Sequence, residues 1–266
     1  MGKTKRKGLP SRRRGDSDEE SHWVRAGLTG QDSLLFDLDP YLYLVDNLVS
    51  KTFSQVTHHY DGENPHALAV IVAPNETVPW QAAFFRSRAD VAVCIPDFDP
   101  ILESAGTELD LSIFLGGLPE KLHGQTDFLL FSGSRWESVE SYQNAIETTY
   151  AALAPGGRAC FVFPGSQSAG AVNVEFVDGD RFSLEKLLSA VRSERFDLIE
   201  TAVLPFAALR MQPDFGVGEF AKRHRGFFGK SARELCLSRL YEEEFQQLIA
   251  DPNDRCAVAL IVGDPQ

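Results

Sequence analysis

Short apolar runs alternate with amphipathic segments over most of this chain. The runs are rich in β-branched residues and contain few polar positions, which is typical of strands buried on both faces of a sheet. This pattern predicts seven strands, at residues 66–74, 91–97, 109–117, 126–133, 158–165, 198–206 and 255–264.

Between the strands, apolar residues recur at helical spacing, which predicts helices. In the segment 138–154 they occupy one face, and Pro155-Gly156-Gly157 is predicted to end the helix. The segment 101–109 is compatible with either a helix or a loop. The predicted helices lie within residues 34–56 and at 77–88, 138–154 and 184–196.

Strands that alternate with helices predict an α/β fold with a doubly wound, mostly parallel sheet of seven strands and helices on both faces. We expect residues 31–266 to form one domain. Residues 207–254 are expected to be an insertion between the last two strands. Because no clear crossover helix joins these strands, we expect the last one to run antiparallel.

The composition is that of an ordinary soluble protein, with 43% hydrophobic and 24% charged residues among 266. The four cysteines are far apart and form no CxxC pair, so neither a zinc site nor a disulfide framework is indicated. We therefore expect an intracellular protein, cytoplasmic or nuclear, without a metal. No apolar run reaches the roughly 18 residues of a membrane span.

The charge is divided unevenly along the chain. The first 15 residues hold seven Lys and Arg and no acid, and subtracting these from the net charge of −12 leaves −19 on residues 16–266. Such composition predicts a disordered tail over residues 1–30. The basic residues within 3–14 form clusters of the kind that bind polyanions or direct nuclear import, although a simple solvated tail is also compatible.

One region carries a motif as well as a pattern. Residues 126–165 contain Asp127-Phe128 at the start of a strand and Leu153-Ala154-Pro155-Gly156-Gly157-Arg158 after the following helix. This stretch resembles the fourth-to-fifth-strand region of class I S-adenosylmethionine-dependent methyltransferases. The resemblance extends in architecture over about residues 40–264 and implies the Rossmann-like fold of that family.

The resemblance also implies a cofactor, S-adenosyl-L-methionine, bound at the carboxyl edge of the sheet. Its contacts would come from the turn after the first strand, an acid after the second, the position after the third and the loop after the fourth. In this sequence these positions are Ala73, Asn75, Glu76, Asp97, Asp99, Gly117 and Ser132. Either aspartate could accept hydrogen bonds from the ribose hydroxyls.

Two of these positions depart from the family pattern. The family has a glycine-rich turn after the first strand, whereas residues 73–79 contain two prolines and no glycine. Side chains with a Cβ crowd a turn where close backbone approach is needed. Gly117 stands where the family has an acid. These departures favour an alternative, a catalytically inactive scaffold that acts through protein or RNA interaction.

Two further features are weaker candidates for contacts with a substrate. Trp136 could stack on a substrate or cofactor ring, but packing on the adjacent helix is the alternative interpretation. The basic residues Lys222, Arg223 and Arg225 precede two phenylalanines and could hold an anionic or RNA-like substrate, or simply face solvent. The acceptor of the methyl group is not indicated by any motif.

Overall fold

The computed structural model describes residues 40–58, 67–72, 85–86, 88–95, 111–132, 136–168, 170–193, 196–206 and 255–263. The predicted tail over 1–30 and the predicted insertion over 207–254 lie outside the described residues. Of the helix predicted at 77–88, only Phe85 and Arg86 are described as helical. Within the described ranges, no helix has the length and apolar character needed to cross a membrane.

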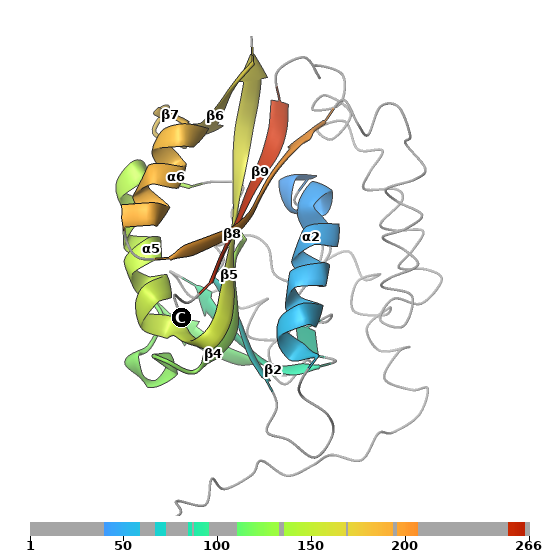
Figure 1. Ribbon diagram of the computed structural model, residues 1–266. Coiled ribbons are helices and arrows are strands. Elements are labelled where there is room, and N and C mark those ends of the chain that lie inside the picture. Colours follow the sequence, from blue (N-terminus) through green and yellow to red (C-terminus); the bar gives the residue numbers. More distant parts are fainter. Residues whose placement is uncertain are drawn as a thin grey trace, which may run out of the picture.

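All seven predicted strands are present (Figure 1). They are β1 (Ala67–Val72), β2 (Ala89–Ile95), β3 (Ser112–Leu115), β4 (Thr126–Ser132), β5 (Leu153–Ser168), β8 (Asp197–Pro205) and β9 (Arg255–Gly263). The helices are α2 (Pro40–Thr57), α5 (Val139–Ala152) and α6 (Leu184–Ser193), with a short 3-10 turn, η2 (Glu120–Leu122).

The strands form one sheet with the spatial order β3-β2-β1-β4-β5-β9-β8. The first five are parallel, whereas β9 runs antiparallel to both of its neighbours, β5 and β8. Six of the seven strands therefore point the same way, and the predicted antiparallel direction of the final strand is confirmed. This is a Rossmann-like, doubly wound α/β fold, as the sequence pattern predicts.

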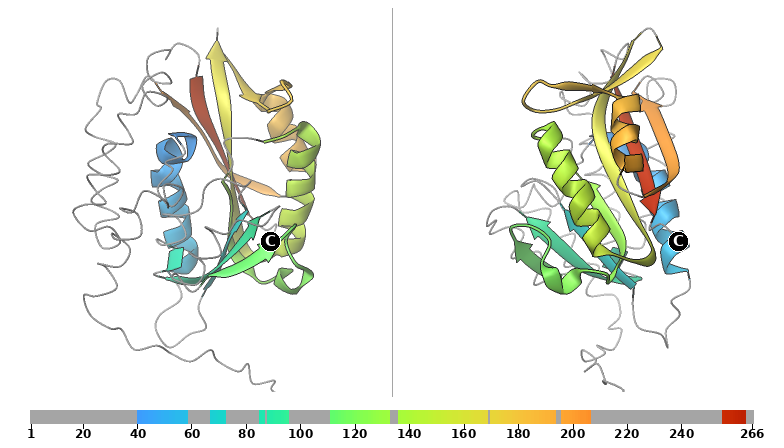
Figure 2. Two further views of the ribbon diagram at one scale, coloured as in Figure 1. Left: turned by 180° about the vertical axis from the view of Figure 1, so that it is seen from behind. Right: turned by 60° about the vertical axis from the view of Figure 1, so that its left-hand side comes forward.

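Helices cover both faces of the sheet, with α2 on one side and α5 and α6 on the other (Figures 1 and 2). Side chains alternate between the two cores along each strand. In β4, Phe128 and Leu130 pack toward α2, whereas Leu129 and Phe131 pack toward α5. The central strands are thus apolar at nearly every position because both of their faces are buried.

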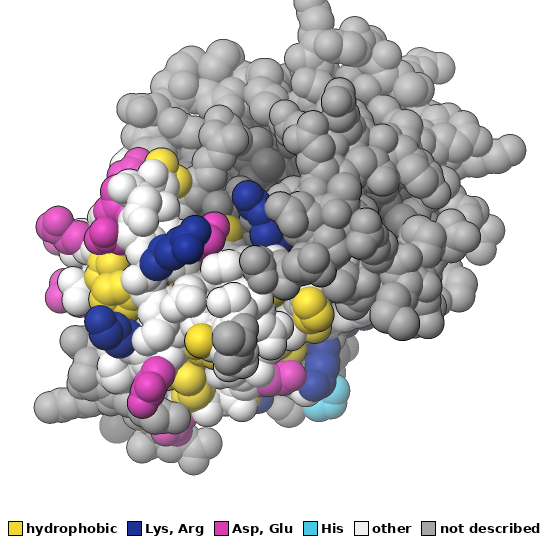
Figure 3. All heavy atoms as spheres, turned by 90° about the horizontal axis from the view of Figure 1, so that it is seen from above, with side chains coloured by type: hydrophobic (Ala, Val, Ile, Leu, Met, Phe, Trp, Pro, Cys, Tyr) yellow, Lys and Arg dark blue, Asp and Glu magenta, His cyan; other side chains and the backbone are white. Residues whose placement is uncertain are grey.

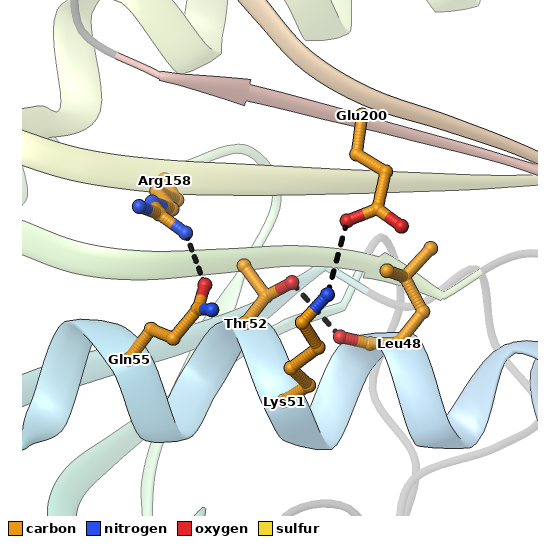
Figure 4. A network of polar contacts seen from close by, with 6 residues as sticks. All are labelled: Leu48, Lys51, Thr52, Gln55, Arg158 and Glu200. Atoms are coloured by element: carbon orange, nitrogen blue, oxygen red, sulfur yellow. Dashed lines mark hydrogen bonds and ion pairs between the residues drawn. The ribbon is translucent and has the colours of Figure 1, made fainter.

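The helix α2 is attached to the sheet by a buried aromatic contact and by polar contacts along its margin. Phe53 is fully buried, with its ring centroid 4.4 Å from that of Phe85 and 5.6 Å from that of Phe128. Lys51 forms an ion pair with Glu200 of β8 at 3.6 Å, and Arg158 of β5 donates to Gln55 (Figure 4). Both polar contacts lie at the surface, so apolar burial dominates the attachment.

Two strands extend the sheet beyond those that the sequence pattern predicts. The strand β5 continues to Ser168, where it pairs antiparallel with β6 (Ala171–Glu175), and β6 pairs with β7 (Arg181–Ser183). The turn between them contains Gly179 at φ +90°, a conformation that glycine adopts readily. An Asp-Gly pair between apolar residues, here Asp178-Gly179, is a recognised hairpin signal that could have predicted this extension.

The helix α5 ends two residues earlier than the predicted helix at 138–154. It begins with a reciprocal capping box, in which Ser138 and Ser141 each accept a backbone hydrogen bond from the other. It ends at Ala152, and Leu153 is already extended. Since a residue before proline disfavours the helical region, Pro155 restricts Ala154 and the chain leaves the helix before Gly156.

Candidate functional site

The carboxyl ends of four parallel strands lie side by side at one edge of the sheet. Val72 of β1 is paired with Cys94 of β2 and with Phe131 of β4, and Ile95 is paired with Leu115 of β3. The chain moves from β1 outward through β2 to β3, then returns to β4 on the other side of β1. Ligands of open α/β sheets bind outside the carboxyl ends at such a reversal.

The predicted cofactor positions follow directly from these strand ends. Ala73, Asn75 and Glu76 come one to four residues after Val72, and Asp97 and Asp99 come two and four residues after Ile95. These five residues lie outside the described part of the chain. The structure therefore brings together the strands that precede them, and the roles of the five side chains stay predictions.

Gly117 is described, and it lies at the exposed end of β3. Its neighbour Gly116 has φ +86° and donates its N–H to the carbonyl of Ile95 at 2.7 Å, which continues the pairing of β2 and β3. A Cβ added at Gly117 would meet no heavy atom within 4 Å, and the backbone there is not in the left-handed region. Position 117 therefore has room for a larger side chain.

The carboxyl end of β4 rests on an aromatic cluster. Ser132, the last residue of β4, is paired with Val162 of β5. Just before it, the ring of Phe131 stacks on Phe161 with centroids 4.8 Å apart. The cluster continues beneath α5 and consists of Phe131, Trp136, Tyr142, Phe161 and Phe163.

Trp136 belongs to this cluster and is only 8% exposed. Its ring stacks on Phe163 with centroids 5.0 Å apart, and its indole N–H donates to the carbonyl of Val162 at 2.8 Å. One face and the polar edge of the ring thus have partners within the protein. These contacts favour the packing interpretation of Trp136, and its contact with a substrate or cofactor ring stays a prediction.

Lys222, Arg223 and Arg225 lie outside the described residues, so their predicted contact with an anionic substrate stays a prediction. On the face seen from above in Figure 3, the described acidic and basic side chains are interspersed with apolar ones. Among the described residues, no group of His, Cys, Asp and Glu is arranged to hold a metal ion.

The described thiols are poor nucleophiles. Burial raises the pKa of Cys94 to about 12, and burial with the nearby Glu175 carboxylate raises the pKa of Cys256 to about 11. Burial raises the pKa of Cys160 and of the Tyr142 phenol as well. Because each group is held in its neutral form near pH 7, none of them is suited to attack an electrophile.

Sequence reasoning missed two contacts, one at the amino end of β4 and one just after its carboxyl end. The Asp127 carboxylate, which is part of the motif, accepts a hydrogen bond from the backbone N–H of Leu68 at 2.8 Å and thereby links β4 to β1. The turn between β6 and β7 contacts the backbone at Trp136 and Glu137. Neither contact is local in the sequence, so only the folded arrangement reveals it.

No family model and no curated protein matches this chain. Similar solved structures include phosphoethanolamine N-methyltransferase 2 of Haemonchus contortus in complex with S-adenosyl-L-methionine, at 14% identity and a TM-score of 0.48 over 95% of this chain. This chain spans 61% of the length of that enzyme.

This chain covers a larger share of two further solved structures. A sarcosine dimethylglycine methyltransferase from Galdieria sulphuraria matches at 11% identity and a TM-score of 0.48, over 93% of this chain and 98% of its own. The 1,6-didemethyltoxoflavin-N1-methyltransferase of Burkholderia thailandensis matches at 10% identity and a TM-score of 0.46, over 93% of this chain and 87% of its own. These similarities are distant, so the fold assignment rests on the observed strand order and directions.

Proposed function

We propose that this chain is a methyltransferase-like protein that binds S-adenosyl-L-methionine at the carboxyl edge of β1 to β4. The observation that carries the proposal is the reversal of strand order between β1 and β4, combined with an antiparallel β9 beside β5. A reversal of this kind creates a ligand crevice at the ends of the strands. The motif in residues 126–165 supports the same assignment.

The residues that would hold the cofactor are those that follow each strand. The turn at Ala73, Asn75 and Glu76 would face its methionine part, and Asp97 or Asp99 would accept hydrogen bonds from the ribose hydroxyls. The open space at Gly117 fits a ligand at the end of β3. When bound, the cofactor supplies an electrophilic methyl group, and the protein contributes orientation of the acceptor.

The alternative is a scaffold that keeps the fold and lacks cofactor binding. The turn over residues 73–79 favours it, because two prolines and no glycine limit how closely the backbone can approach a ligand. Fold alone does not decide between these functions. In the scaffold alternative, the basic residues within 3–14 would supply polyanion or RNA contacts, while the acidic remainder repels phosphate.

Isothermal titration with S-adenosyl-L-methionine and with S-adenosylhomocysteine separates the two functions. We expect saturable heat, and an increase in stability of about 2.7 kcal/mol when the ligand is present at 100 times its dissociation constant. We expect Asp97→Asn or Asp99→Asn to weaken binding at least tenfold. No heat and no thermal shift at millimolar ligand would overturn the enzyme proposal and leave the scaffold alternative.

Asp90 supplies a matched control for these variants. It lies on the same strand as the residues that precede Asp97, but near the amino end, where it is half exposed and forms an ion pair with Arg86 at 3.3 Å. We expect Asp90→Asn to leave ligand affinity unchanged. Equal weakening by Asp90→Asn would mean that the loss reflects the net charge of the protein rather than a contact with the ligand.

A further inference from the structure

The connection between β4 and α5 is attached to the sheet at both of its ends. At the upstream end, Ser132 pairs with Val162 of β5. At the downstream end, Trp136 donates its indole N–H to the carbonyl oxygen of the same Val162 at 2.8 Å. One residue of β5 therefore anchors both ends of a connection that spans only three intervening residues.

The turn between β6 and β7 also forms hydrogen bonds with the downstream end of this connection. The N–H of Val177 donates to the carbonyl of Trp136 at 2.8 Å, and the N–H of Asp178 donates to the carbonyl of Glu137 at 3.1 Å. The turn is closed on itself by hydrogen bonds between Phe176 and Asp180 and between Gly179 and Phe176. In Figure 2 this extension lies over the start of α5.

Outside the seven-stranded sheet, the extension also packs against α6, and the side chains of Val174 and Phe176 are buried in the core on that side. It is attached to β5 beyond the part that pairs with β4, and the side chain of Val177 at its turn is 63% exposed. At the tip of this turn, the backbone N–H groups of Val177 and Asp178, rather than the side chain of Val177, therefore make the contacts with Trp136 and Glu137. These contacts are made within five residues of the carboxyl end of β4.

We propose that Trp136 and the turn Phe176–Asp180 form a clamp that positions the carboxyl end of β4 for ligand binding. The clamp acts through hydrogen bonds to backbone carbonyls and does not touch the ligand, so Trp136 and Val177 are positioning residues. This inference rests on the proposed function, because it assigns the extension to the same edge of the sheet. It also predicts a structural effect that can be measured without any ligand.

Val177 offers a pair of variants that separates the backbone contact from the side chain. Val177→Pro removes the N–H that donates to Trp136, whereas Val177→Ala keeps it and shortens only an exposed side chain. We expect Val177→Pro to weaken S-adenosylhomocysteine binding at least tenfold, and Val177→Ala to bind like the parent. Binding by Val177→Pro that equals the parent would overturn the clamp.

Hydrogen exchange of peptides that cover residues 129–141 tests the clamp in the absence of ligand. We expect faster exchange in Val177→Pro than in Val177→Ala. If the parent binds no S-adenosylhomocysteine, the proposed function fails and this exchange decides the clamp alone. Equal exchange in both variants would overturn the clamp, even in a protein that binds the ligand.

A second pair of variants tests the indole hydrogen bond. Its result does not depend on whether the proline variant folds. Trp136→Phe removes the donor to Val162, and Tyr142→Phe removes a phenol donor to the carbonyl of Leu187 in the same aromatic cluster. Both variants lose one buried hydrogen bond, but only that of Trp136 ends on Val162, the partner of Ser132 at the end of β4. We expect Trp136→Phe alone to accelerate exchange over 129–141 and to weaken ligand binding; equal effects would indicate a general packing role.

Discussion

Two neighbouring glycines after β3 differ in the substitutions that they allow. Gly116 has φ +86°, so any side chain there would strain the backbone although no atom lies close to its Cβ position. Gly117 lies outside the left-handed region, and no heavy atom lies within 4 Å of its Cβ position. The absence of an acid at 117, which the family pattern would supply, is therefore not imposed by packing in this protein.

Gly117→Asp is predicted to improve S-adenosyl-L-methionine binding several-fold, because the resemblance implies that an acid at this position would accept a hydrogen bond from the adenine amino group of the proposed cofactor. The free energy of unfolding should change by less than about 0.5 kcal/mol, since the site is exposed and unstrained. Titration calorimetry and chemical denaturation measure the two effects.

Gly117→Asn controls for size without charge, and Gly116→Ala should cost about 1 kcal/mol through its positive φ. A loss of stability in Gly117→Asp that matches Gly116→Ala would contradict the geometry at this turn. An unchanged affinity in a stable Gly117→Asp variant would mean that the adenine does not lie at the end of β3.

At the scale of elements, the packing of α2 on the sheet is predicted to depend more on one aromatic side chain than on the ion pair of this helix. Phe53→Ala should lower the free energy of unfolding by about 3–5 kcal/mol, because it leaves a cavity beside Phe85 and Phe128. Lys51→Ala on the same helix should change it by less than about 1 kcal/mol, since both partners of its ion pair are largely exposed. Urea denaturation compares the variants; equal losses would mean that surface charges hold the helix.

The elements also show how far the sequence predicts this fold. The central strands were predictable because burial on both faces makes them apolar at almost every position, as in Ala67–Val72. The extension β6–β7 was not predicted, since its residues are partly exposed and follow a glycine- and serine-rich segment that suggests a loop. The end of α5 was misplaced by two residues because Pro155 acts on the residues before it.

The candidate site was predictable only as a set of strand ends. The carboxyl ends of parallel strands meet at one edge of a sheet. The order of the strands in the sequence therefore predicts that Gly117 and Ser132 lie at that edge. The role of Trp136 could not be derived in this way. Its partners Phe163 and Val162 come from a different strand, and an aromatic residue after a strand is equally compatible with packing and with ligand contact.

At the scale of the whole molecule, three buried thiols report on global unfolding. Cys160 lies in the core beneath α2, whereas Cys94 and Cys256 lie in the core beneath α5 and α6, so opening of both faces is needed to expose all three. Their raised pKa values keep them protonated in the folded chain. In the unfolded chain they ionise near their ordinary pKa of about 8.5.

Stability is therefore predicted to fall as the pH rises above about 8, because the unfolded chain then loses thiol protons that the folded chain retains. Below that pH both states hold these protons, and the thiols contribute no dependence on pH. Denaturation at pH 7.5, 9 and 10.5 measures the trend, and Cys94→Ala with Cys256→Ala should flatten it. Alkylation by iodoacetamide at pH 8 should reach these three thiols only in denaturant, as read by mass spectrometry of cysteine peptides. Rapid labelling of Cys160 in the native protein would contradict the closed core between α2 and the sheet.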